Sequence, residues 1–285
     1  MTNQVTTALR AVRRAFNSHA RYHLTSGEIV CADALELLRI LPHDCADVVF
    51  LDPPFNLGKS YGRSGSKGDR LGDPEYFGYM LRVLARSIAI LKPGGSLYIY
   101  HLPKWSIKLA GVLVDVLEFR HWIAISMKNG FARGNRLYPA HYSLLYFTKG
   151  EPRVFHRPKI EPLRCPECDV YVRDYGGYEQ FIAKGINLSD VWDDLSPVRH
   201  RKHKSRPANE LPIEIPRRAV AISGRPGGLF VDPFAGSGTT LLAAREAGMH
   251  FVASDRERQH CSITHKRLLK ARTGRRKGRA HAGNR

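Results

Sequence analysis

A short apolar run that ends at two consecutive prolines limits the fold of this chain more than any other feature. Within an apolar run that begins at Ala46, residues 47–51 are β-branched, aromatic or otherwise apolar with one acidic exception, and they are too few for a helix, so they predict a short buried strand. Pro53 and Pro54 have no N–H group that could continue a strand ladder, so the chain must turn sharply after this strand. The turn leaves Asp52 and the aromatic ring of Phe55 at the strand's carboxyl end, the edge where open α/β sheets bind ligands.

A second segment of the same kind lies near the other end of the chain. An aspartate at a strand end is often only a turn or helix cap, and Asp52 alone does not exclude that role. Residues 228–232 predict another buried strand that ends in Asp232, and a glycine-rich turn and the helix-forming residues 241–246 follow it. The N–H groups at the start of such a helix are free to bind a ligand. Two strand ends of this chemistry favour a binding site, and we expect them to meet in space.

The turn after Asp232 does not match the common phosphate-binding loops. A P-loop needs Lys before its Ser or Thr, whereas Thr239 follows Gly238 directly, and the dinucleotide fingerprint needs a third glycine where this chain has Leu241. The acidic side chain at the turn disfavours phosphate and favours a cation. A further predicted strand ends in Asp255, at a spacing from the glycines that suits hydrogen bonds to ribose hydroxyls. The ligand should carry a ribose and a positive charge but no pyrophosphate, and S-adenosylmethionine fits that description.

The two segments together resemble the motifs of the amino-methylating DNA methyltransferases. The first, Asp52-Pro53-Pro54-Phe55, is similar to the catalytic motif of that family. The second is similar to its cofactor motif and consists of Asp232, Pro233, Phe234, Ala235, Gly236, Ser237, Gly238, Thr239 and Thr240. The catalytic motif comes first in the chain, which is the order of the circularly permuted β class of the N6-adenine and N4-cytosine enzymes. The resemblance extends over about residues 28–270.

Predicted strands and helices alternate along most of the chain, which indicates an α/β fold with a parallel sheet covered on both faces. The predicted strands are 28–31, 47–51, 96–100, 121–127, 142–147, 228–232 and 249–254. The predicted helices are a short basic one among residues 5–24, then 33–41, 74–91, 104–118, a helix after Pro212, one that starts at 241 and one that ends near 269. The resemblance implies a Rossmann-like, S-adenosylmethionine-dependent methyltransferase fold with a mostly parallel seven-stranded sheet and an antiparallel hairpin, circularly permuted, with a small basic recognition insertion.

This interpretation divides the chain into four parts. Residues 1–26 form a basic N-terminal helix that could pack as a lid over the sheet, and residues 27–127 and 209–270 form the catalytic domain. Residues 128–208 contain the end of the sheet, at about 141–148, and the target-recognition region that the resemblance implies. Residues 271–285 form a basic tail that we expect to be disordered.

The resemblance also implies cofactor contacts outside the glycine-rich turn. Asp33 matches the family position whose carboxylate approaches the adenine amino group of the cofactor, although it is an equally good helix N-cap, and both roles are compatible. Ala34 follows it at the start of the helix. Residues just before the cofactor strand line the amino-acid end of the cofactor in relatives, and here only Pro212 matches their pattern well. The remaining expected contacts are Asn209, Leu211, Asp255 and Arg256.

A polyanionic partner is indicated by the charge. The chain has 45 Lys and Arg against 26 Asp and Glu, a net charge of +19, and the basic residues are clustered rather than evenly spread. The resemblance makes that partner double-stranded DNA, with homodimer formation and a cognate restriction endonuclease left open. The densest run, 199–206, is either a DNA-backbone contact or a solvated loop. The expected DNA contacts are Lys59, Arg63, Arg133, Arg136, Arg199, Arg201, Lys202, Lys204 and Arg206.

The expected reaction is methylation of the exocyclic amine of a base rotated out of the duplex. The resemblance assigns catalysis to Asp52, Pro53, Pro54 and Phe55: the Asp52 carboxylate and the Pro53 carbonyl accept the two amine N–H groups, and Phe55 stacks on the base. Asp at the first motif position favours adenine N6 over cytosine N4. An RNA substrate and a non-catalytic DNA-binding accessory protein of the same fold are the alternatives.

The remaining signals concern metal, compartment and membrane. Five cysteines at irregular spacing indicate a reducing, cytoplasmic setting. The resemblance implies a bacterial or phage protein that is located on DNA. Cys165 and Cys168 form half of a zinc knuckle that would need two more ligands, such as His156, His200 or His203, so we favour a free thiol pair and predict no metal. The chain has no apolar run long enough for a membrane span and no secretory signal at its start.

Overall fold

The fold is built on one nine-stranded sheet. The computed structural model of the protein describes residues 3–18, 20–57, 71–126, 135, 137, 140–162, 164–165, 167–171, 182, 184–195 and 210–271. The strand order of the sheet is β1-β2-β11-β10-β3-β4-β6-β5-β9. These strands are β1 Arg21–Leu24, β2 Gly27–Cys31, β3 Ala46–Leu51, β4 Leu91–His101, β5 Glu118–Ser126, β6 His141–Thr148, β9 Val191–Trp192, β10 Leu229–Asp232 and β11 His250–Asp255.

Five adjacent strands of the sheet are parallel, and antiparallel pairs flank them on both sides. Strands β2, β11, β10, β3 and β4 run parallel to one another, whereas β6 is antiparallel to both β4 and β5. The predicted parallel centre and antiparallel hairpin are therefore confirmed. Two edge strands exceed the predicted seven: β1 pairs antiparallel with β2, and β9 pairs parallel with β5.

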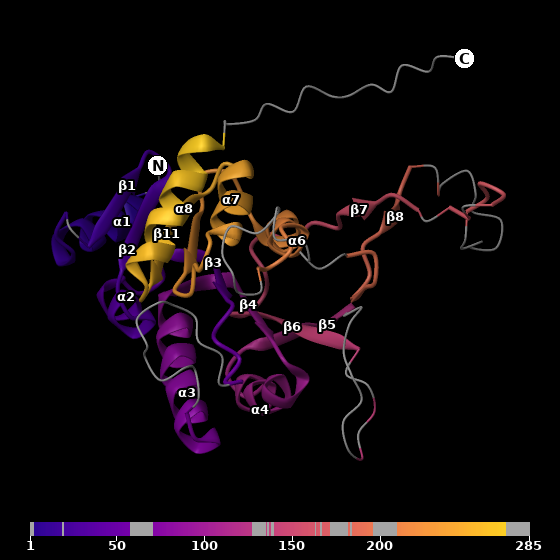
Figure 1. Ribbon diagram of the computed structural model, residues 1–285, viewed down its shortest axis with the longest axis horizontal. Helices are drawn as coiled ribbons and strands as arrows, with labels where there is room; N and C mark the ends of the chain where they lie inside the picture. The colour runs from indigo at the N-terminus through magenta and orange to yellow at the C-terminus, as the bar shows by residue number, and fades with distance from the viewer. Residues whose placement is uncertain are drawn as a thin grey trace.

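Helices cover both faces of the sheet, as Figure 1 shows. Helices α1 to α4 pack on one face and α6 to α8 on the other. Alternation along β3 explains this, because Val49 and Leu51 enter the first apolar layer while Val48 and Phe50 enter the second. The helices are α1 Asn3–Ala15, α2 Ala34–Ile40, α3 Asp73–Ile90, α4 Pro103–Leu113, α6 Glu214–Ser223, α7 Thr239–Glu246 and α8 Arg258–Lys270.

The short basic helix predicted among residues 5–24 is α1, but the strand that follows it was not predicted. The helix ends at Ala15, and β1 follows it. Arg21 and His23 point to the same side of β1, and both contact the fully buried Glu28 of β2, at 2.9 and 2.8 Å. The strand therefore forms because of its partner on β2, which periodicity within residues 5–24 does not reveal.

Two other predicted boundaries also move. The helix predicted over 104–118 ends at Leu113, and the chain enters β5 at Glu118. The strand predicted at 96–100 starts at Leu91 and includes the Lys92-Pro93-Gly94-Gly95 segment that the sequence marks as a helix end. Lys92 belongs to the sheet because its ammonium group forms an ion pair with a buried carboxylate there.

That carboxylate belongs to Asp47, and the pair ties together the amino ends of three central strands. The Asp47 carboxylate accepts hydrogen bonds from Lys92 Nζ at 2.5 Å, from the Leu229 N–H at 2.9 Å and from Arg225 Nε at 2.9 Å. Only 2% of the Lys92 side chain is exposed. Burial acts to raise the pKa of Asp47, but these donors outweigh it, so the pKa lies below its ordinary value.

The order of the strands creates a switch point between β10 and β3. From β3 the chain continues through α3 to β4 on one side, and from β10 it continues through α7 to β11 on the other. Helices α3 and α7 lie on opposite faces, so the carboxyl ends of β3 and β10 are left with a crevice between the two connections. Ligands of open α/β sheets bind at this position.

The described part of the predicted recognition region forms a separate arm. Strands β7 Lys159–Ile160 and β8 Ile186–Asn187 pair antiparallel in a small second sheet, and β9 then returns to the edge of the large sheet. In Figure 1 this arm projects to the side away from α1 and α2. No helix in the described ranges is long and apolar enough to cross a membrane.

The Asp47–Lys92 pair yields a stability prediction. Replacing Asp47 by Ala leaves the Lys92 ammonium buried without its partner, so the free energy of unfolding should fall by about 3–5 kcal/mol. Urea denaturation followed by circular dichroism measures this change.

The matched control is the solvent-exposed Asp73–Lys104 pair, whose side chains are 49% and 58% exposed. Asp73→Ala should leave the urea midpoint nearly unchanged, because water screens such pairs. Equal losses in the two variants would show that burial is not what makes the Asp47 pair important.

Candidate active site

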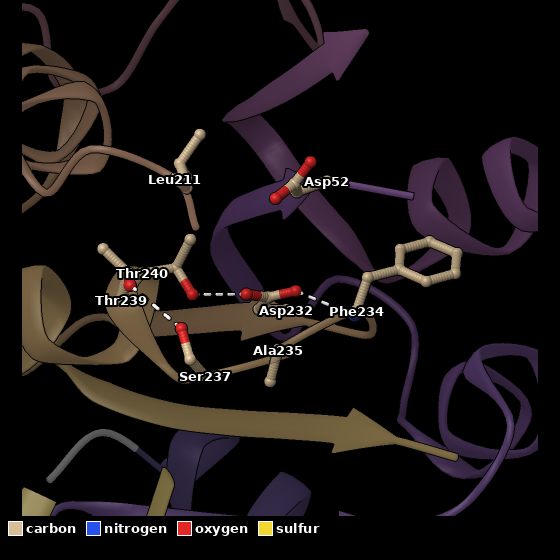
Figure 2. Close-up of a pocket in the computed structure, with 8 residues that line it drawn as sticks. All are labelled: Asp52, Leu211, Asp232, Phe234, Ala235, Ser237, Thr239 and Thr240. Carbon is tan, nitrogen blue, oxygen red and sulfur yellow. Dashed lines mark hydrogen bonds between the residues drawn. The ribbon is translucent and has the colours of Figure 1, made fainter. Parts of the chain in front are cut away.

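A shallow cavity lies at the switch point, outside the carboxyl ends of β3 and β10. The empty space between its lining residues is about 230 Å³, and part of this space is open to solvent. Figure 2 shows Asp52 and Asp232 reaching it from neighbouring strands, with the threonines of α7 beside them. The lining residues are Asp52, Leu211, Asp232, Phe234, Ala235, Ser237, Thr239 and Thr240. The two strand ends that the sequence singled out therefore meet in space.

The register of β10 against β3 explains the meeting. Phe230 pairs with Val48, and both side chains face the layer of α6 to α8. Because side chains alternate along a strand, Asp232 lies on the same face as Phe230. Asp52 follows directly after β3, and its side chain lines the same cavity. A shift of one residue in either strand would send one carboxylate to the opposite face.

Asp232 is held rigidly and is almost completely buried, with 1% exposed. One carboxylate oxygen accepts the Phe234 N–H at 2.8 Å, and the other accepts the Thr240 hydroxyl. Burial, the largest cause, and the nearby Asp52 and Asp255 carboxylates together raise the pKa of Asp232 to about 7, against the lowering effect of these two donors. None of the described residues that line the cavity has a basic side chain.

The glycine-rich turn is shaped by α8 behind it. Gly238 has φ = +77°, and a Cβ there would lie 2.4 Å from the Thr264 methyl carbon. The Thr264 hydroxyl donates to the Gly236 carbonyl at 3.0 Å, and Gly236 also has positive φ, at +52°. Only glycine fits at position 238, since both the backbone conformation and the space exclude a side chain.

Asp255 is connected to the same turn. Its Oδ2 accepts the Gly236 N–H at 3.0 Å, while its Oδ1 accepts the Glu257 N–H at 2.8 Å and lies 3.1 Å from His260 Nδ1. Asp255 does not line the cavity itself. It lies at the carboxyl end of β11, which β10 separates from β3. Its hydrogen bond with Gly236 fixes the turn that lines the cavity.

Asp33 lies at the next strand end and is the N-cap of α2. Its carboxylate accepts the Leu35 N–H at 2.8 Å, and Glu36 accepts the Asp33 N–H at 3.0 Å, a complete capping box. The N-cap prediction is confirmed. Asp33 also forms an ion pair with Arg256 at 2.5 Å, so two predicted cofactor residues are in direct contact, with Ala34 buried beside them.

Leu211 reaches the cavity because the residue before it is anchored. Glu210 is 8% exposed and accepts Arg267 Nη1 of α8 at 2.7 Å. The same guanidinium nitrogen donates to the Ser237 carbonyl at 2.8 Å. Arg267 therefore joins the segment before α6 to the glycine-rich turn. The sequence offered no signal for this, because an arginine in the last turn of a helix is usually solvated.

Aromatic rings surround the diproline turn beside Asp52. The Phe55 ring stacks on His101 with centroids 5.1 Å apart, and it also contacts Tyr142 at 5.6 Å and Tyr100 at 5.8 Å. Burial, and then the nearby Asp52 carboxylate, raise the pKa of both tyrosines. The cluster joins the ends of β4 and β6 to the turn after β3.

Tyr76 and His101 are the residues near the turn that sequence reasoning missed. The Tyr76 hydroxyl donates to the Pro54 carbonyl at 2.6 Å and lies 2.7 Å from His101 Nε2. His101 is the last residue of β4, so the strand-end rule that singled out Asp52 could have found it. Tyr76 carries no such signal, because within α3 it reads as one more apolar-face residue.

Several predicted residues lie outside the described residues. They are the DNA contacts Lys59, Arg63, Arg133, Arg136, Arg199, Arg201, Lys202, Lys204 and Arg206, the cofactor residue Asn209, and the zinc candidates His200 and His203. Cys165 and Cys168 are free thiols on the arm, and no group of three metal-ligating side chains occurs among the described residues.

Comparison with known sequences places this site in a family. The sequence model of the DNA methylase family of N6 and N4 methyltransferases matches residues 46–266. The Type II methyltransferase M.BamHI of Bacillus amyloliquefaciens is 40% identical over 249 residues, which are 87% of this chain and 58% of that protein. The Type II methyltransferase M.HpaI of Haemophilus parainfluenzae is 27% identical over 243 residues, 84% of this chain and 73% of that protein. The chain thus spans little more than half the length of M.BamHI.

Solved structures agree in fold. The cytosine-N4-specific PvuII DNA methyltransferase superposes with a TM-score of 0.66 at 17% identity, over 88% of this chain and 89% of that one. M1.HpyAVI in its complex with S-adenosylmethionine superposes with a TM-score of 0.59 at 20% identity, over 85% of this chain and 98% of that one. The chain therefore belongs to the DNA methylase family of N6-adenine and N4-cytosine methyltransferases, whose cofactor is S-adenosylmethionine.

Proposed function

We propose that this protein transfers a methyl group from S-adenosylmethionine to the exocyclic amine of a base in double-stranded DNA, adenine N6 or cytosine N4. The observation that carries the proposal is that Asp52 and Asp232 face one cavity from neighbouring strand ends at the switch point of the sheet. Family membership and the Type II methyltransferase relatives support the same reaction.

The residues at the site fit the cofactor. Asp232 supplies a buried carboxylate for a cationic group, and burial together with the nearby Asp52 and Asp255 carboxylates raises its pKa, so a cation beside it would stabilise its charged form. The Asp52 and Asp232 strand ends line the cavity, and the Asp255 and Asp33 strand ends continue the site along the same edge of the sheet. We assign the ribose to Asp255 and the adenine to Asp33 and Ala34. When bound, S-adenosylmethionine supplies an electrophilic methyl group on a sulfonium.

The base amine needs activation because its lone pair is conjugated with the ring. In our proposal Asp52 and the Pro53 carbonyl accept its two N–H groups, which draws the nitrogen toward tetrahedral geometry and directs the lone pair at the methyl group. The methyl group would come from bound S-adenosylmethionine, and the methylated amine would release one proton to solvent. The Asp52 carboxylate stabilises the positive charge that develops on the nitrogen.

The aromatic cluster offers a surface for the base. Phe55 and Tyr142 are both half-buried, and each carries a ring near Asp52. A base rotated out of the duplex is normally held between such rings while its polar edge is read. We assign the stacking role to Phe55, with the target amine directed at Asp52.

The DNA contacts belong to the same proposal. The charge of +19 and the projecting arm of β7 and β8 support a recognition role for residues 128–208, with sequence-independent affinity from the C-terminal basic run. The catalytic parts at 27–127 and 209–270, the N-terminal part at 1–26 and the permuted order remain predictions. So do a homodimer, a cognate restriction endonuclease and the preference for adenine.

The Asp52→Ala variant tests the reaction. It should lower kcat by about 100- to 1,000-fold, since it removes the acceptor that orients and stabilises the amine, while cofactor and DNA affinity stay the same. The measurement is transfer of labelled methyl groups to genomic DNA, followed by nucleoside analysis that separates N6-methyladenine from N4-methylcytosine.

The control variant is Asp115→Ala, which removes an exposed carboxylate just beyond α4. It should methylate at the wild-type rate. A wild-type protein that binds DNA and cofactor but transfers no methyl group would support the accessory-protein alternative, and full activity of Asp52→Ala would refute the catalytic assignment.

Cofactor binding should depend on pH through Asp232. Below its pKa of about 7 the carboxyl group is protonated and neutral, so a cation can bind beside it only if the proton leaves. The affinity for S-adenosylmethionine should therefore fall as the pH drops below 7, by up to about tenfold per pH unit. Titration calorimetry between pH 5.5 and 8.5 measures it.

The Asp232→Asn variant is the comparison for this titration. It keeps the shape of the side chain and an oxygen for Thr240, but it carries no charge at any pH. Its affinity should be weaker at pH 8 and less dependent on pH. Parallel pH profiles for wild type and variant would show that Asp232 does not interact with the charge of the cofactor.

A further inference from the structure

A chain of hydrogen bonds runs from a buried histidine to the diproline turn. The Leu102 N–H lies 2.8 Å from His101 Nδ1, His101 Nε2 lies 2.7 Å from the Tyr76 hydroxyl, and that hydroxyl lies 2.6 Å from the Pro54 carbonyl. His101 is fully buried and Tyr76 is 3% exposed. The chain connects the end of β4 and the first turns of α3 to the turn that carries Asp52.

The direction of every bond in this chain is determined. A backbone N–H can only donate, so His101 Nδ1 is an acceptor and carries no proton. The single proton of the neutral ring is then on Nε2, which donates to the Tyr76 oxygen. The Tyr76 hydroxyl therefore has its own proton left for the Pro54 carbonyl, which can only accept. Burial lowers the pKa of His101 to about 3, so the ring is neutral at physiological pH.

The same imidazole also supports the other end of the motif. Its face stacks on the Phe55 ring, while its edge holds Tyr76. The Trp105 ring packs against Tyr76 with centroids 4.6 Å apart, which fixes the phenol in place. One buried side chain thus positions both the carbonyl and the aromatic ring that follow Asp52.

We propose that Tyr76 and His101 are positioning residues for methyl transfer, which hold the Pro54 carbonyl and Phe55 so that the Asp52 carboxylate and the Pro53 carbonyl are presented to the target amine. The inference rests on the proposed function. It also assigns the two carbonyls of the diproline different roles, because the Pro54 oxygen receives the Tyr76 proton.

The test compares single and double variants. Tyr76→Phe removes the hydroxyl but keeps the packing against Trp105, and it should lower kcat by about 10- to 100-fold with KM for S-adenosylmethionine and the thermal midpoint little changed. His101→Leu should have a similar effect on kcat. His101→Gln places an amide N–H near the Nε2 position and should recover part of the lost rate. The double variant Tyr76→Phe/His101→Leu should be no slower than the slower single variant, since both act through one carbonyl.

The matched control is Tyr98→Phe. Tyr98 also lies on β4 and is fully buried, and its hydroxyl lies 3.0 Å from the Ser223 hydroxyl, away from the diproline turn. Its loss should leave kcat unchanged. Additive rate losses in the double variant, or an equal loss in Tyr98→Phe, would overturn the proposal.

A measurement without activity separates this inference from the proposed function. In ¹⁵N spectra of the imidazole rings, assigned by the signals missing in His101→Gln, His101 should show a protonated Nε2 and an unprotonated Nδ1 at every pH from 5 to 8. A proton on Nδ1, or titration near pH 6.5, would refute the proposed hydrogen-bond chain even in a protein that methylates DNA. If the protein shows the predicted spectrum but transfers no methyl group, the hydrogen-bond chain is supported and only its role in methyl transfer is refuted.

Discussion

The parallel pairing of β10 with β3 is the constraint on which the rest of this site depends. These strands are distant in sequence, yet their register places Asp52 and Asp232 at neighbouring strand ends and on one cavity. The buried Asp47–Lys92–Arg225 cluster ties the opposite ends of the same strands together. Stability and chemistry are thus separated along one pair of strands: ion pairs join their amino ends, and the Asp52 and Asp232 carboxylates that line the cavity lie at their carboxyl ends.

The electrostatics of the cavity follow from this arrangement. Asp232 is buried, is held by two neutral donors, and has two further carboxylates nearby, so burial and these carboxylates disfavour its charged form. In the proposed function a cationic cofactor stabilises that form, whereas a phosphate would add to the repulsion. The diproline turn is held differently. The Pro54 carbonyl accepts a hydrogen bond from Tyr76, and the Phe55 ring stacks on His101. The groups that contact the turn, Tyr76 and His101, are neutral, whereas Asp52 in the turn carries a carboxylate.

Sequence patterns predicted the elements whose signals are local. The strands that lead to Asp52, Asp232 and Asp255 are short and mostly apolar, and the capping box at Asp33 is readable from four residues. Predictions failed where a distant partner decides the structure. Strand β1 is stabilised by hydrogen bonds of Arg21 and His23 with Glu28. Strand β4 begins earlier than predicted because Lys92 donates a hydrogen bond to Asp47. Neither partner is visible within the window over which periodicity is judged.

The sequence by itself determined the chemistry of the motifs, their order and the class of cofactor, because two short segments carry residue types that few other sites combine. Tertiary structure alone decided which side chains face the cavity, the raised pKa of Asp232 and the path from His101 through Tyr76 to Pro54. These depend on strand register, burial and the direction of hydrogen bonds between residues that are far apart in the chain. Such distances are set only when the sheet has formed and its two helical layers have packed.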